Sequence, residues 1–162
     1  MKTKSFIALS IGAICVVAAL VSTLASPSNS RGSLGDGQHL EGSWLVTASV
    51  VGDPSLIKAL LTCSPNGEVV ETPSVPLAVS TGHGVWERTG NRQFALTVLY
   101  LRRDEAGGLI GTSKVRSLLS VNESMTEGSG RFETTVFDLA GNQVGAFEGT
   151  AESTRIQSEP LN

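Results

Sequence analysis

Histidine and cysteine are scarce in this sequence, and their scarcity limits the chemistry that the chain can perform. There are two histidines, His39 and His83, and two cysteines, Cys15 and Cys63. A metal site built from several histidines, or a Ser-His-Asp triad, therefore has little material. We expect a protein without a metal and without a cofactor.

The first residues carry an export pattern. Two lysines precede an apolar run over residues 6–20, and small residues then lead to a cleavage site after Ala25. This order predicts a cleavable signal peptide over residues 1–25. A retained anchor needs about 20 apolar residues, and this run is shorter. We expect a secreted or periplasmic protein with no stable membrane insertion after cleavage.

Removal of this leader changes both the charge and the cysteine count. The full chain has 12 Lys and Arg against 15 Asp and Glu; loss of Lys2 and Lys4 leaves 10 against 15, a net charge of −5. Nucleic acid and anionic membranes are poor partners for an acidic chain. Without Cys15, Cys63 has no intramolecular disulfide partner. It is expected to be a buried thiol, with a reactive or intermolecular thiol as the alternative.

The remaining chain shows one domain between two short segments. Residues 26–40, rich in Ser, Gly and Pro, are predicted to form a flexible linker, residues 41–157 a β-barrel domain, and residues 158–162 a tail. From Trp44 onward, short runs rich in Val, Leu, Thr and Phe alternate with turn residues, and no stretch keeps a helical apolar period. The predicted strands are Ser43–Val51, Ile57–Cys63, Glu68–Thr72, His83–Arg88, Gln93–Arg102, Leu109–Ser120, Arg131–Asp138 and Gln143–Thr154.

Two hairpins share a turn sequence. Asp104-x-Ala-Gly107 recurs as Asp138-x-Ala-Gly141. Pairing Arg103 with Gly108 puts Phe94, Leu96, Val98 and Tyr100 on one inner face, opposite Ser117, Val115, Ser113 and Gly111. The same register in the second hairpin puts Phe132 opposite Phe147, and Arg131 opposite Glu148 as an outer ion pair.

Small and aromatic residues share this inner face, and so many small residues would pack loosely between two sheets. A closed barrel with an internal cavity accounts for them and leaves no exposed edge. We therefore predict an all-β fold, an antiparallel up-and-down barrel of about eight strands.

The strand that contains His83 has two possible faces. Pairing Arg88 with Gln93 turns His83 inward, near Tyr100, and turns Trp86 outward, unless a β-bulge re-aims it. Glu87 would also face inward, but it lies about 13 Å along the strand from His83, too far for an acid–base pair. His83 and Tyr100 are therefore the catalytic candidates if the protein is an enzyme.

Two anchors suggest a family. Glu41-Gly42-Ser43-Trp44 opens the first strand, and Ser153-Thr154-Arg155-Ile156 follows the last. A Gly-x-Trp before a meander that closes with Arg resembles the lipocalin and calycin barrels, with the allene-oxide-cyclase-like barrels as another group. The resemblance implies that Trp44 and Arg155 stack at the closed end of the barrel as a cation–π pair.

Three functions fit this interpretation. The leading hypothesis is a lipocalin-like barrel that binds a small, mostly apolar molecule, without catalysis. The second is a cyclase or isomerase that shapes a hydrophobic substrate in the cavity. The third is a structural or interaction protein with a filled core and a partner surface at Trp86, Leu99 and Leu101, which would allow a homo-oligomer. The predicted ligand-binding residues are Phe94, Leu96, Val98, Tyr100, Phe132, Phe147 and His83.

Overall fold

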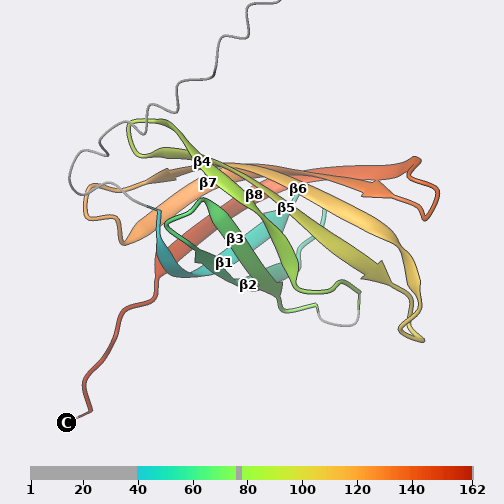
Figure 1. Cartoon of the computed structure of the whole chain (residues 1–162), viewed down its shortest axis with the longest axis horizontal. Coiled ribbons are helices and arrows are strands. Elements are labelled where there is room, and N and C mark those ends of the chain that lie inside the picture. Colours follow the sequence, from blue (N-terminus) through green and yellow to red (C-terminus); the bar gives the residue numbers. More distant parts are fainter. Residues whose placement is uncertain (1–39, 76–77, 162) are drawn as a thin grey trace, which may run out of the picture. The chain divides into compact units, whose positions relative to one another are not determined.

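The computed structural model describes residues 40–75 and 78–161, which form a closed antiparallel β-barrel (Figure 1). Eight strands pair in chain order, and β1 pairs with β8 to close the barrel. The predicted fold class is thus confirmed. The strands are β1 (Gly42–Val50), β2 (Leu56–Cys63), β3 (Glu68–Pro73), β4 (Gly82–Gly90), β5 (Gln93–Arg103), β6 (Leu109–Val121), β7 (Glu127–Phe137) and β8 (Gln143–Arg155).

The start of the described chain lies within the packed domain. The predicted signal peptide and residues 26–39 of the predicted linker lie outside the described residues. Leu40, assigned to that linker, is fully buried, and its carbonyl accepts a hydrogen bond from the indole Nε1 of Trp44 at 2.9 Å. The linker prediction is therefore wrong at Leu40. Within the described part of the chain, no helix is long and apolar enough to cross a membrane.

The two hairpins with the repeated sequence also share their turn geometry. The amide of Gly107 donates to the carbonyl of Asp104 at 3.0 Å, and the amide of Gly141 donates to that of Asp138 at 3.1 Å. Both hairpins, β5–β6 in yellow and β7–β8 in orange to red, extend beyond the short strands β1–β3 (Figure 1). The sequence repeat is therefore a repeat of turn structure.

In the first of these hairpins, each β5 residue pairs with a β6 residue two positions later than predicted. Phe94, for example, lies opposite Leu119 and not opposite Ser117. One residue of the shift comes from the turn, in which the Asp104 amide donates to the Gly108 carbonyl. The other comes from a β-bulge beside Gly111, whose φ of 143° suits glycine. Because side chains alternate with period two, the predicted inner face is unchanged.

The second hairpin has the same two-residue shift. Phe132 lies opposite Gly149, where a Cβ would contact the aromatic ring of Phe132 at 2.6 Å. Arg131 stands opposite Thr150 rather than Glu148, so the predicted outer ion pairing is wrong. The inner face is again the predicted one, because the shift is even.

The closed end of the barrel is built around Trp44 and Arg155. Trp44 is fully buried, and the guanidinium carbon of Arg155 lies 4.5 Å from the centroid of its ring. Arg155 also donates from Nε to the carbonyl of Met125 (2.7 Å) and from Nη1 to that of Glu41 (2.6 Å). Gly42 has a φ of 118°, and a Cβ there would meet Nη1 at 2.9 Å. Glycine before Ser-Trp therefore leaves the space that the guanidinium fills.

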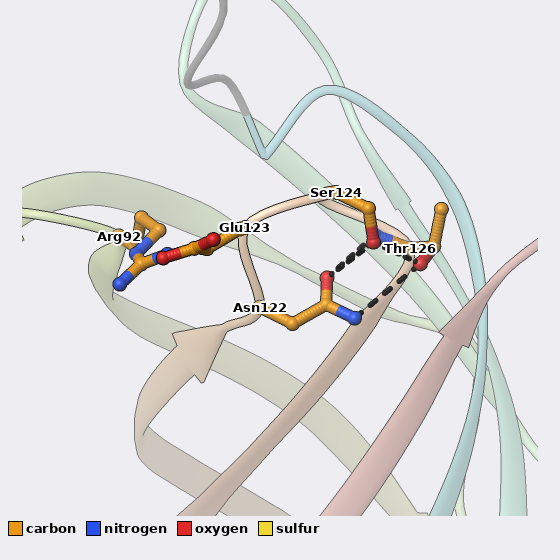
Figure 2. Close-up of polar contacts among 5 residues, drawn as sticks. All are labelled: Arg92, Asn122, Glu123, Ser124 and Thr126. Atoms are coloured by element: carbon orange, nitrogen blue, oxygen red, sulfur yellow. Dashed lines mark hydrogen bonds and ion pairs between the residues drawn. The ribbon is translucent and has the colours of Figure 1, made fainter.

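The turn between β6 and β7 holds Met125 in place for this contact. Its backbone has a φ of 56°, which is uncommon for a residue other than glycine. Figure 2 shows the Asn122 side chain bridging to the hydroxyls of Ser124 and Thr126, at 3.1 and 3.4 Å. The Asn122 Oδ1 also accepts from the backbone amide of Thr126 at 3.0 Å. This network compensates for the strained backbone and aims the Met125 carbonyl at Arg155.

Candidate functional site

The interior of the barrel contains a cavity of about 200 Å³. Two of its lining residues, Val75 and Phe147, are 39% and 44% exposed, so the cavity reaches the surface at the end opposite Trp44. An engineered apolar cavity of about 150 Å³ binds benzene, so this one suits a molecule of similar size or slightly larger. The lining residues are Val46, Ala48, Val50, Ile57, Leu61, Glu71, Pro73, Val75, Val79, Leu96, Val98, Tyr100, Ser113, Val115, Ser117, Leu119, Phe132, Thr134, Phe147, Ala151 and Ser153.

Five of the seven predicted ligand-binding residues line this cavity: Leu96, Val98, Tyr100, Phe132 and Phe147. They come from β5, β7 and β8, whose inner faces follow the predicted alternation. The rest of the wall comes largely from β1, β2, β3 and β6. The structure therefore brings together most of the predicted set, places Ser113, Val115 and Ser117 of the predicted inner face in the same wall, and adds residues of β1, β2 and β3 that the sequence analysis did not assign.

Phe94 belongs to the closed-end core and does not line the cavity. It is fully buried, and its ring meets that of Trp86 edge-on, with 5.7 Å between the ring centroids. The Trp86 Nε1 donates to the carbonyl of Ser64 at 2.9 Å. The prediction that Trp86 faces outward is therefore wrong, and the alternative with a β-bulge is confirmed, because a bulge lies between Arg88 and Gly90.

The same bulge moves His83 to the outer face. His83 pairs with Leu99 and is exposed, and Val85 and Glu87 are exposed on the same side of β4. The register differs from the predicted one by a single residue, which exchanges the two faces of the strand. His83 therefore cannot contact Tyr100 inside the barrel, and its predicted inward placement is wrong.

The cavity wall instead holds a pair that the sequence analysis missed: the buried Tyr100, on β5, and the half-buried Glu71, on β3. The Tyr100 hydroxyl is a hydrogen-bond donor beside the Glu71 carboxylate, close enough to affect its pKa. Burial raises the pKa of Glu71, and the hydrogen bond from Tyr100 opposes this shift. Burial and the neighbouring carboxylate both raise the pKa of Tyr100, so its hydroxyl keeps its proton and acts as the donor.

A missing side chain at Gly82 makes this pair possible. Gly82 pairs with Glu71 across β3 and β4, and a Cβ built on it would overlap the ring of Tyr100 and approach Val98 at 2.6 Å. The Tyr100 ring therefore lies against the Gly82 backbone. Any larger residue at this position would push the hydroxyl away from Glu71.

Other polar atoms in the wall are hydroxyls. Ser113 and Thr134 are buried at 7% and 3% exposure, and Ser117 is half-buried. Ser153, at 6% exposure, has a buried Oγ with no hydrogen-bond partner among the described residues. A buried hydroxyl without a partner costs about 1–3 kcal/mol. The cavity therefore contains a polar atom that a bound molecule would satisfy.

The other candidate chemical groups lie elsewhere. Cys63 is 2% exposed in the closed-end core, and burial raises the pKa of its thiol to about 12, which keeps it protonated. Among the described residues, no group of three or more His, Cys, Asp or Glu side chains is arranged to hold a metal ion. Glu71 is the one charged residue in the cavity wall as described.

The outer surface carries several exposed apolar side chains. Leu99 and Leu101 are 48% and 43% exposed, as the hypothesis of an interaction protein expected, but Trp86 faces the interior. The interior also contains the cavity. The filled core that this hypothesis requires is therefore absent from the described part of the chain.

Comparison with known proteins gives no assignment, since no protein-family model matches the chain and no curated protein matches it at a significant level.

Proposed function

We propose that this protein binds a small, largely apolar molecule inside its barrel. The observation that carries the proposal is the cavity of about 200 Å³, whose wall is mostly Val, Leu, Phe and Ala and which opens at one end. Ligand sites are typically concave and apolar with a few placed polar groups, and Glu71, Tyr100 and Ser153 are such groups here. The closed barrel and the contact between Trp44 and Arg155 support a place among lipocalin- and calycin-like barrels.

The test is a titration with toluene and benzyl alcohol, whose size suits the cavity, followed by calorimetry and thermal unfolding. We expect saturable binding of at least one of them to the wild-type barrel. Ser117→Leu fills the cavity from β6 and should abolish binding, whereas Ser129→Leu, on the outer face of β7, should leave it unchanged. Failure of both compounds to bind, or equal binding to Ser117→Leu, contradicts the proposal.

A second candidate function, an isomerase, draws support from the pair of Glu71 and Tyr100. A carboxyl in an apolar cavity, beside a hydroxyl donor, is an arrangement used for proton transfer at carbon. The pair takes the place of His83, which lies outside the barrel. Exchange of the α-protons of cyclohexanone in D2O, followed by NMR, tests this function. An exchange rate unaffected by Glu71→Gln contradicts it.

Export is part of the same proposal. The lysines, apolar run and small-residue site over residues 1–25 support a cleavable leader. Expression of the full chain in a bacterial host, followed by mass spectrometry of the periplasmic fraction, should give a product that starts at Ser26. A full-length product confined to the cytoplasm contradicts this part.

A further inference from the structure

We propose that the ligand carries a protonated amine and that Glu71 holds it. This inference rests on the proposed binding function and specifies its ligand as a small apolar skeleton with one cationic head group. Three features of the cavity wall support it: its charge, its balance of hydrogen-bond donors and acceptors, and its geometry.

The charge of the wall has one sign. Glu71 is the one carboxylic acid among the lining residues, and none of them is Lys, Arg or His. A carboxylate in an apolar site is costly unless it is paired with an opposite charge and hydrogen-bonded. Tyr100 supplies a hydrogen bond but no charge. A ligand ammonium would supply the missing charge.

The balance of donors and acceptors also favours a donor-rich ligand. A carboxylate has about four acceptor positions, and the Tyr100 hydroxyl fills one of them. Ser153 Oγ has no partner among the described residues; it lies on β8, which β1 and β2 separate from β3, the strand that carries Glu71. An ammonium has three donors and no acceptor, which matches a wall in which acceptors are in excess.

The geometry fixes which end of the ligand is polar. Glu71 is followed on the inner face of β3 by Pro73, and then by Val75, which is exposed near the open end. On this strand, the wall beyond the acid is thus apolar up to the mouth. An amine at Glu71 would therefore have its hydrocarbon part in the apolar section, with the aromatic rings of Phe132 and Phe147 in the same wall.

Three probes with one skeleton test the inference: benzylamine, toluene and benzoate, titrated by calorimetry at pH 7. We expect benzylamine to bind at least fivefold more tightly than toluene, and benzoate to bind most weakly. Glu71→Gln should weaken benzylamine at least tenfold and change toluene less than threefold. Glu68→Gln, the same change on the outer face of β3, is the matched control and should leave all three affinities unchanged.

The outcomes separate this inference from the proposed function. Toluene binding without a preference for benzylamine, or a preference that survives Glu71→Gln, overturns the inference and leaves the binding function standing. Failure of all three probes overturns the inference, and failure of benzyl alcohol as well overturns both. If Glu71→Gln does not fold, a pH titration of the carboxyl ¹³C resonance of Glu71 in the wild-type protein decides: benzylamine should move the titration midpoint to lower pH, because an ammonium favours the carboxylate, and an unchanged midpoint overturns the inference.

Discussion

Replacement of Arg155 is the sharpest test of how the barrel is closed. Its guanidinium lies over Trp44 and donates hydrogen bonds to the carbonyls of Met125 and Glu41. A cation–π contact contributes about 0.5–2 kcal/mol, and a hydrogen bond from a charged group about 1.5–3 kcal/mol. Because neighbouring contributions overlap, we expect Arg155→Ala to lower the free energy of unfolding by about 3–5 kcal/mol.

Arg155→Lys separates charge from geometry at the same position. Lysine keeps the positive charge, but its ammonium is a compact donor and does not reproduce the planar fork of the guanidinium. One of the two carbonyl contacts should be lost. We therefore expect a smaller reduction in the free energy of unfolding, about 1.5–3 kcal/mol.

Urea unfolding, followed by tryptophan fluorescence and far-ultraviolet circular dichroism, measures both variants. Arg116→Ala is the control, because Arg116 also forms an ion pair, with Glu133 at 2.7 Å, but the two side chains are 58% and 61% exposed. That variant should cost less than about 1 kcal/mol. If Arg155→Ala costs no more than Arg116→Ala, the closed end is not held as described.

Three further predictions concern buried groups. Because burial raises the pKa of Glu71 above its ordinary value of 4.5, the unfolded chain releases this proton first; the stability that Glu71 contributes is complete below pH 4.5 and is lost as the pH rises through the raised pKa. Urea unfolding between pH 4 and 8 should show this loss in the wild type and not in Glu71→Gln; parallel profiles contradict it. Gly82→Ala should cost about 1–3 kcal/mol by overpacking against Tyr100, and Gly145→Ala, whose Cβ would lie 3.7 Å from Val136 in ordinary contact, should cost less; equal urea midpoints contradict this. Cys63, with its pKa raised to about 12, should react with a thiol reagent at pH 8 far more slowly in the native protein than in urea, and equal rates contradict its burial.

The sequence predicted the barrel and much of its interior because a register error of an even number of residues leaves each side chain on the same face of its strand. In the β5–β6 and β7–β8 hairpins, the turn and the bulge each shift the register by one residue. The sum is two, so Leu96, Tyr100 and Phe132 keep their predicted inward direction. The eight predicted strands correspond to β1–β8 because turn residues mark most strand ends, although β7 begins at Glu127, before the predicted Arg131.

At β4 the shift was odd, and the prediction failed. The bulge between Arg88 and Gly90 changes the register by one residue, so His83 moves outward and Trp86 inward. A signal was present in the sequence, because Gly82, on the same face of β4 as Trp86, has no side chain and so leaves room for the Tyr100 ring. Whether a glycine makes room for a side chain of the neighbouring strand depends on how the two strands pair. The alternation of residues along one strand does not predict that pairing.

Glu71 was missed for a related reason. Acidic residues occur at both Glu68 and Glu71, so charge alone favours neither face of β3. The inner face is the one with Val69, which is 1% exposed in the closed-end core. Its partner Tyr100 is distant in sequence, and only closure of the barrel brings the two together.

The central claim is that the barrel encloses a cavity that a small apolar molecule enters. Methyl-resolved NMR during a titration with toluene tests it most directly. The account predicts shift changes confined to methyl groups of the cavity wall, such as Val46, Leu96 and Val115, with none at Leu60 or Val85 on the outside. Changes confined to the outer methyl groups, or none at saturating toluene, would contradict it.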